Sequence, residues 1–266
     1  FDNRDLFSKL DLVFFDTTSI YFEGQGSEHF GHRGFSKDHR PDLHQMIVGA
    51  VLDNNGRPIC CEMWPGNTTD VTTLIPEVQR LRNRFRIGNF CIVADRGMIS
   101  ANTLDKLDKD QIPYILGARM RRVKLISTEI LSRSGRYKEV YPENADRRKP
   151  APLKVKEVFH EGTRYIVCLN ERQARKDAAD RQAILESLER QLKKGPKALV
   201  GNKGYRKYLK LAKDSARIDP AKVKAEAHFD GKWVLATNTE LPADQVAIKY
   251  KELWRVERVF RDVKSL

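Results

Sequence analysis

The sequence predicts an α/β protein in which helices flank a mixed β-sheet. Two observations indicate this architecture. Three apolar, strand-like runs come first in the 266-residue chain, and helical and strand-like segments then alternate as far as residue 119. A hairpin-like segment and a long helical segment end the chain. Leading antiparallel strands followed by alternating helices and strands are typical of a mixed sheet covered by helices.

The leading strands are predicted from their apolar runs. DLVFFD at 11–16 predicts a buried strand that ends at an acid. LHQMIVGAVLD at 43–53 and RPICCEMW at 57–64 are joined by Asn-Asn-Gly, which predicts a β-hairpin. Between them, the Gly-, His- and charge-rich segment 26–42 predicts a loop.

The next elements follow from helical spacing and capping residues. Thr69 or Asp70 is expected to cap a helix whose Leu74, Val78, Leu81 and Phe85 repeat at helical spacing. The remaining predicted elements are a strand at 89–95, a helix at 101–109 capped by Ser100, strands at 112–119, 154–160 and 163–170, a charged helix at 171–194, a hairpin at 224–238 turning at Asp230-Gly231, and a helix at 242–264.

The charge is concentrated in the middle of the chain. The 49 basic and 36 acidic residues give a net charge of +13. Residues 1–95 carry 10 basic and 13 acidic side chains, residues 96–225 carry 32 and 16, and residues 226–266 carry 7 and 7. A regional excess of this size favours a polyanionic partner, above all nucleic acid. The alternative is a solvated, Lys-rich surface that keeps the protein soluble.

Several classes of protein are excluded by the composition. No run of 18 apolar residues is present, so no membrane-spanning helix is expected. The first residues lack the pattern of a secretory signal. The four Cys residues have no metal-like spacing and are expected to be free thiols in a reducing compartment. These features predict a cytoplasmic protein that binds no membrane.

Three acids are candidates for chemistry. Asp16 and Asp95 each close an apolar run, and their side chains would converge if the two strands were neighbours. The alternative is that each starts a turn or caps a helix. Tyr250, Glu257 and Lys264 are spaced by seven, which places them on one face of a helix. The alternative for this face is an ordinary ion-pair network.

Four histidines within and just after the segment 26–42 are candidates for a metal site. His29, His32, His39 and His44 lie near Asp38 and Asp42, but their spacing matches no zinc pattern. A loop that faces solvent or DNA is the preferred interpretation.

Three segments resemble the blocks of an insertion-sequence transposase of the DDE type, which has an RNase H-like catalytic core. They are VFFDTTS, VADRGMIS and YKELWRVERVFRDVK. The last is similar to the Tyr-x2-Arg-x3-Glu-x6-Lys signature of one large bacterial group, with Tyr250, Glu257 and Lys264 at the right spacing. Leu253 stands where the signature has Arg, and Arg255 or Arg258 is a candidate to replace it. The matching blocks span roughly 11–118 and 224–264.

The resemblance implies a site and a reaction. Asp16, Asp95 and Glu257 would be the catalytic triad and the ligands of two Mg²⁺ ions, with Asp16 bridging both ions and Mn²⁺ able to substitute. The enzyme would cut transposon ends and join them to target DNA. The residues expected to hold DNA are Tyr250, Lys264, Arg96, Arg255, Arg258 and Arg261.

The resemblance also implies the organisation and partners of the chain. Residues 1–119 and 226–266 would form the RNase H-like core, and 120–225 would be a basic insertion region between the second and third acids. The partners would be double-stranded DNA and a second copy in a homodimeric synaptic complex, at the bacterial nucleoid. The alternatives are an inactive DNA-binding relative and a nuclease of the same fold that only hydrolyses.

Overall fold

The chain divides into two compact units. The computed structural model describes residues 11–85, 90–142, 148, 150–193, 205–211 and 216–265. The core unit comprises Phe1–Gly135, Lys156–Ile166 and Val234–Leu266, and the second unit comprises Arg136–Val155 and Val167–Trp233. The two units are described separately below.

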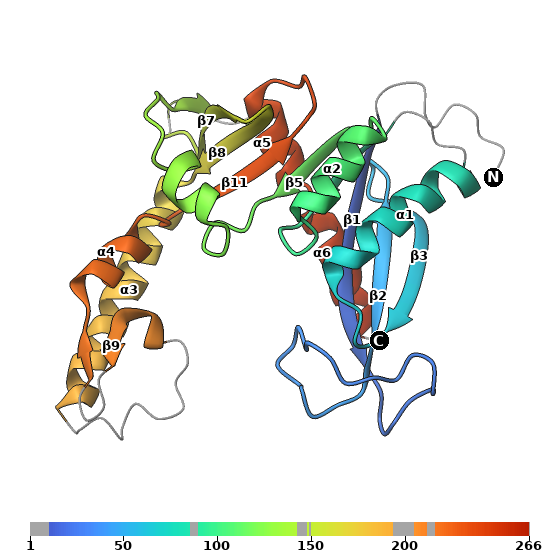
Figure 1. Ribbon diagram of the computed structural model, residues 1–266, viewed down its shortest axis with the longest axis horizontal. Helices are drawn as coiled ribbons and strands as arrows, with labels where there is room; N and C mark the ends of the chain where they lie inside the picture. Colours follow the sequence, from blue (N-terminus) through green and yellow to red (C-terminus); the bar gives the residue numbers. More distant parts are fainter. Residues whose placement is uncertain are drawn as a thin grey trace. The chain divides into compact units, whose positions relative to one another are not determined.

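A mixed sheet forms the centre of the core unit (Figure 1). Its strands lie in the order β3-β2-β1-β4-β5-β11, followed by the core-unit parts of β8 and β7. β1 pairs in parallel with β4, and β4 in parallel with β5, whereas β2, β3 and β11 join by antiparallel pairing. The strands are β1 (Asp11–Tyr21), β2 (Gln45–Leu52), β3 (Pro58–Pro65), β4 (Phe90–Ala94), β5 (Tyr114–Gly117), β7 (Leu153–His160), β8 (Thr163–Leu169) and β11 (Lys232–Thr237).

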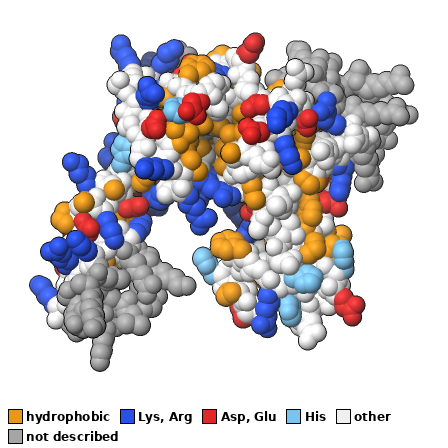
Figure 2. Space-filling view, in the orientation of Figure 1, with side chains coloured by type: hydrophobic (Ala, Val, Ile, Leu, Met, Phe, Trp, Pro, Cys, Tyr) orange, Lys and Arg blue, Asp and Glu red, His pale blue; other side chains and the backbone are white. Residues whose placement is uncertain are grey.

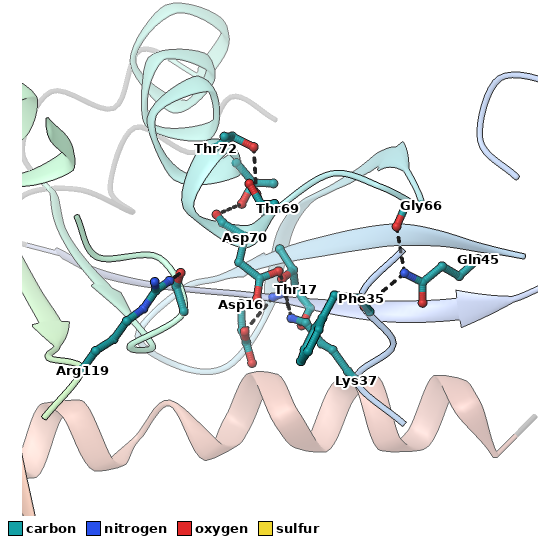
Figure 3. A network of polar contacts seen from close by, with 12 residues as sticks. Asp16, Thr17, Phe35, Lys37, Gln45, Gly66, Thr69, Asp70, Thr72 and Arg119 are labelled. Atoms are coloured by element: carbon teal, nitrogen blue, oxygen red, sulfur yellow. Dashed lines mark hydrogen bonds and ion pairs between the residues drawn. The ribbon is translucent and has the colours of Figure 1, made fainter. Parts of the chain in front are cut away.

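Helices cover both faces of the leading strands. α1 (Asp70–Phe85) lies on one face of β1 and β2, with α2 (Ala101–Lys109) beside it, and α6 (Trp254–Lys264) lies on the opposite face (Figures 1 and 3). α5 (Ala243–Lys251) packs on β4 and β5. Because both faces are covered, a central strand can be apolar throughout. All five residues of β4 are buried, as are Leu12 through Phe15 of β1.

The second unit holds a long polar helix and short strands. α3 (Glu171–Leu192) begins at Asn170, whose side chain accepts a hydrogen bond from the Gln173 amide at 3.0 Å. Leu188, Tyr208 and Leu209 form a small apolar cluster in this unit. Its other described elements are β6 (Lys138–Val140), which pairs with the first residues of β7, a short 3-10 helix (Arg206–Tyr208), β9 (Leu209–Leu211), β10 (Ala216–Ile218) and α4 (Pro220–Ala227).

Most predicted elements are confirmed, and the mixed α/β class is correct. The 45–65 hairpin, the helix capped by Ser100 and the strand that ends before Asp95 are all present. Ser100 Oγ accepts a hydrogen bond from the Thr103 amide at 3.1 Å, as its capping role requires. Part of the predicted helix at 171–194, and other parts of the basic region 120–225, lie outside the described residues.

Three local predictions were wrong. Asp16 does not end its strand, because β1 continues to Tyr21 along β2. The segment 224–238 is not a hairpin: its first residues belong to α4, where Asp219 accepts hydrogen bonds from the amides of Ala221 and Lys222 and Pro220 occupies the first turn.

The third correction concerns the last helix, which is two helices. α5 ends at Lys251 and α6 begins at Trp254. Between them, the amide of Leu253 donates to Tyr250 and the amide of Val256 donates to Leu253. These bonds span three residues instead of four, so the chain tightens at this point and buries Leu253. Tyr250 therefore lies on a different helix from Glu257 and Lys264.

Candidate active site

The parallel pairing of β1 and β4 brings the first two acids together. Phe15 lies opposite Ala94 in this register, so Asp16 and Asp95 are the next residues along the two adjacent strands. Asp16 lies within β1, opposite Ala50 of β2, whereas Asp95 directly follows the end of β4. The strand register therefore brings the two acids side by side, as the sequence predicted.

Glu257 reaches the same cleft from α6. Val256 and Phe260 are buried against the sheet and fix this helix. The cleft has a volume of about 550 Å³, and its lining includes Asp16, Asp95 and Glu257. A fourth acid, Asp70, and four cations, Lys37, Arg96, Arg261 and Lys264, complete the charged part of the lining. All of these residues belong to the core unit.

The acids supply the oxygen donors that a hard divalent cation prefers. Within the described part of the chain, no three His, Cys, Asp or Glu side chains come close enough to hold a single metal ion. Mg²⁺ is commonly held by one or two carboxylates together with water and substrate phosphates, so it does not need three protein ligands. The lining thus fits Mg²⁺ chemically, with its carboxylates placed around a shared space.

Asp16 is energetically costly to ionise. Burial, together with the smaller effect of the nearby charges of Asp95 and Asp70, raises its pKa to about 7. The Lys37 ammonium and the Thr17 amide, which donates to Asp16 Oδ1 at 2.7 Å, oppose this rise. A cation placed in the cleft would favour the ionised form for the same electrostatic reason that Lys37 does.

A Lys-Thr-Asp network beside Asp16 was not foreseen from the sequence (Figure 3). The Lys37 ammonium donates to the carbonyl oxygen of Thr17 at 2.6 Å and to its hydroxyl at 2.7 Å. The Thr17 hydroxyl in turn donates to Asp70 Oδ1 at 2.7 Å, and Lys37 pairs with the same oxygen at 3.1 Å. The only sequence signals were a lysine in a charged loop and an acid at a helix start, and both have ordinary explanations.

Two further groups hold Asp95 and the two residues after it. The Tyr250 hydroxyl donates to Asp95 Oδ1 at 2.9 Å, and burial together with Asp95 raises the pKa of that phenol. Arg119, which the sequence did not single out, donates to the carbonyl of Arg96 at 2.8 Å and to that of Gly97. Tyr250 and Arg119 therefore fix the segment that carries Asp95.

The predicted DNA-binding residues separate into two groups. Arg96, Arg261 and Lys264 line the cleft, and Lys264 pairs with Asp38 of the loop between β1 and β2. Arg255 instead donates to the carbonyl of Asn54, and Arg258 is exposed beside Asp262. Neither Arg255 nor Arg258 is part of the cleft lining, and Leu253 is buried.

The mixed sheet with helices on both faces and an acid-lined cleft is the arrangement of an RNase H-like domain. Residues 7–266 match the family described as Transposase DDE domain, and the chain belongs to that family. The resemblance predicted from the three sequence blocks is thereby confirmed. No curated protein matches the chain. None of the described helices has the length and apolar character needed to cross a membrane.

Replacing Asp16 by Asn is expected to stabilise the metal-free protein. The folded-state pKa of about 7 lies above the carboxyl's usual value of 3.8, so the ionised Asp16 opposes folding increasingly as the pH rises between these values. At pH about 8, Asp16→Asn should raise the free energy of unfolding by about 1–3 kcal/mol, and below pH about 4 it should have no effect.

Thermal or urea unfolding across this pH range measures the effect. Asp105→Asn, which removes an exposed carboxylate from α2, is the control and should show no such gain. A stability gain for Asp16→Asn that is independent of pH would contradict the electrostatic origin.

Gly117 is expected to tolerate no side chain because of Tyr250. A Cβ at Gly117 would lie 2.4 Å from the Tyr250 hydroxyl oxygen and 2.9 Å from the Arg96 amide nitrogen. Gly117→Ala should cost about 1–3 kcal/mol of stability. In a Tyr250→Phe background the cost should fall by about 1 kcal/mol, because the nearest clashing atom is gone. Equal costs in both backgrounds, measured by urea unfolding, would show that Tyr250 does not restrict this position.

Proposed function

We propose that this protein is an active DNA transposase that cuts transposon ends and joins them to target DNA in a metal-dependent reaction. One observation carries the proposal: Asp16, Asp95 and Glu257, separated by 78 and 161 residues in the chain, line a single cleft. Membership in the transposase family gives the general class of reaction. The intact set of three acids favours activity over an inactive DNA-binding relative.

Asp16, Asp95 and Glu257 would hold two Mg²⁺ ions, for which Mn²⁺ can substitute. When bound, such ions activate an attacking oxygen and stabilise the departing one. The chain's own residues prepare the site for them. Tyr250 fixes the orientation of Asp95 through its hydrogen bond, and Lys37 balances the charge of Asp16 and Asp70. Without a bound cation, Asp16 resists ionisation, because its pKa is raised to about 7.

The cations of the cleft would hold the DNA backbone at the scissile bond. Arg96, Arg261 and Lys264 line the same space as the acids, so phosphates bound by them would lie beside the metal ligands. Such contacts fix the position of the substrate and carry no sequence information. Arg258 is exposed and would contact DNA beyond the cleft, whereas Arg255 and Tyr250 would act through the groups that they bind.

The basic middle of the chain would extend the DNA-binding surface. We assign residues 120–225 as an insertion region between two parts of the core, 1–119 and 226–266. On α3, the exposed cations are Arg172, Arg175, Lys176 and Arg190. Figure 2 shows Lys and Arg side chains gathered over the helical part of the second unit. Two transposon ends require two active sites, so a homodimer on nucleoid DNA is the proposed working form.

Neutralising any one of the three acids is expected to abolish cleavage. Asp16→Asn, Asp95→Asn and Glu257→Gln should each reduce Mg²⁺-dependent cutting by at least about 1000-fold, because a metal ligand is lost. DNA affinity should stay within about threefold, since no cation is removed. The substrate is a supercoiled plasmid carrying the genomic DNA that flanks the coding sequence on both sides. Cleavage is followed on gels, and binding by gel shift.

Glu252→Gln is the matched control for these variants. Glu252 pairs with Lys249 and Arg255 and is not part of the cleft lining, so its loss should leave cleavage intact. Undiminished cutting by any of the three acid variants would remove that acid from the proposed triad. Pre-cut ends then separate a transposase from a hydrolase, because only a transposase joins them to a second plasmid.

The pair formed by Lys264 and Asp38 is expected to modulate DNA affinity. Lys264→Gln should weaken binding and lower the slope of log K against log salt by about 1, because one phosphate contact is lost. Asp38→Asn should strengthen binding by about 1.5- to 5-fold, because the competing carboxylate is neutralised. Asp42→Asn is the control, since Asp42 pairs with Arg40 of the same loop and lies outside the cleft lining. Equal salt slopes for the wild type and Lys264→Gln would show that Lys264 contacts no phosphate.

A further inference from the structure

We propose that Lys37 determines the metal selectivity of the cleft by withholding Asp70 from the cations that the site binds. The inference rests on the proposed metal-dependent function and adds a selectivity-determining residue to it. Four acids line the cleft, and the proposed reaction uses three of them. Asp70 is the fourth, and Lys37, from the loop between β1 and β2, pairs with its carboxylate.

Asp70 lies where a free carboxylate could bind a cation together with the proposed triad. It is the first residue of α1, and its Oδ1 accepts a hydrogen bond at 2.7 Å from the hydroxyl of Thr17, the residue after Asp16. A Cβ added to Gly97 would lie 3.0 Å from Asp70 Oδ2, so this oxygen lies close to the segment that follows Asp95. Asp70 therefore stands between the segments that carry the first two acids of the triad.

The ammonium group of Lys37 is fully engaged by acceptors of the protein (Figure 3). It donates to the carbonyl oxygen of Thr17 at 2.6 Å and to the Thr17 hydroxyl at 2.7 Å, and it pairs with Asp70 Oδ1 at 3.1 Å. An ammonium group has three N–H donors, so these three acceptors leave no donor for a DNA phosphate. The role of Lys37 is therefore to be sought in the acid that it pairs with, and not in a contact with DNA.

The residues on either side of Lys37 hold it in this position. The Tyr21 hydroxyl, at the end of β1, shares a 2.7 Å hydrogen bond with the Ser36 hydroxyl and accepts one from the amide of Asp38 at 3.2 Å. The side chains of Lys37 and Asp70 are 25% and 26% exposed, so water and salt screen their attraction less than that of an exposed pair. A cation that competes for Asp70 must therefore displace an anchored partner.

The number of available carboxylates decides which divalent cation a site prefers. Mg²⁺ is commonly held by one or two carboxylates and keeps several water molecules, whereas Ca²⁺ takes about six to eight oxygen ligands in a flexible geometry. While Lys37 occupies Asp70, the cleft offers few carboxylates, which suits Mg²⁺. Release of Asp70 would add a ligand, and Ca²⁺ would gain more from it than Mg²⁺.

The test measures Ca²⁺ and Mg²⁺ binding by the full chain, without DNA, by isothermal titration calorimetry at pH about 7.5. Lys37→Met should bind Ca²⁺ about 10- to 100-fold more tightly than the wild type, because the released carboxylate becomes a ligand. Its affinity for Mg²⁺ should rise by only about 2- to 5-fold, the effect of one lost positive charge. The ratio of the two affinities is the readout, since a change of charge alone acts on both ions alike.

Replacing Asp70 tests whether the gain passes through this acid. Asp70→Asn alone should weaken the binding of both ions equally, by at most about fivefold, because Lys37 already withholds the carboxylate. When Asp70→Asn is combined with Lys37→Met, the Ca²⁺ affinity should return to within about threefold of the wild type. Lys264→Met is the charge-matched control. Lys264 lines the same cleft, but its partner Asp38 lies outside the lining, so the ratio of affinities should not change.

Lys37→Gln repeats the test with a variant that keeps a donor for the Thr17 carbonyl, and thermal unfolding without cations shows that each variant is folded. Two results would overturn the inference: a Lys37 variant in which both affinities rise by the same factor, or a gain in Ca²⁺ affinity that persists when Asp70 is also replaced. Neither result touches the proposed function, which stands or fails on plasmid cleavage by the variants of the three triad acids.

Discussion

The parallel pairing of β1 with β4 is the constraint on which the candidate site depends. It places Asp16 and Asp95 at consecutive positions of two neighbouring strands, although 78 residues separate them in the chain. The pairing is stable because both strands carry apolar residues that face covered sides of the sheet. A slip of one residue would turn the carboxylate of Asp16 to the other face. The buried run from Leu12 to Phe15 therefore fixes the position of the candidate acids as well as the core.

Bringing these acids together has an electrostatic cost, and the neighbouring residues reduce it. Asp16 is largely withdrawn from water and has Asp95 and Asp70 near it, so its pKa rises to about 7. Lys37 lowers that cost directly, and the Thr17 hydroxyl links Lys37 to Asp70. The cleft thus combines acids that repel one another with cations that partly neutralise their charge. This balance explains why a loop lysine is fixed at the centre of the site although the loop itself is rich in glycine.

Much of the fold could be predicted from the sequence, because apolar runs and caps act locally. The Asn54-Asn55-Gly56 turn, Ser100 and the strand before Asp95 were all recognisable from a few neighbouring residues. The helix break at Glu252 and Leu253 was not, since neither Gly nor Pro marks it and the turn forms by burying Leu253. The end of β1 was misplaced for a related reason. Thr17, Thr18 and Ser19 are polar, but they are buried in the strand.

The acids of the candidate site could be predicted from the sequence, but the groups that support them could not. Lys37 and Asp70 meet Thr17 across 20 and 53 residues of sequence, and Arg119 reaches back 23 residues to Arg96. No local pattern encodes such contacts, because they exist only once the sheet and α1 have assembled. The same holds for Asp38 and Lys264, which are 226 residues apart.

The composition of the cleft follows one electrostatic principle. Among the described residues, its lining holds four acids and four cations, so the cleft is close to neutral where the chain as a whole carries +13. A site lined by cations alone would attract DNA and repel Mg²⁺, and a site lined by acids alone would do the reverse. A lining that contains both acids and cations can receive Mg²⁺ and DNA phosphates together, because each of them meets side chains of opposite charge. In the proposed function, the basic residues that attract DNA over longer distances would then lie outside the cleft, and residues 96–225, with 32 basic and 16 acidic side chains, would provide most of them.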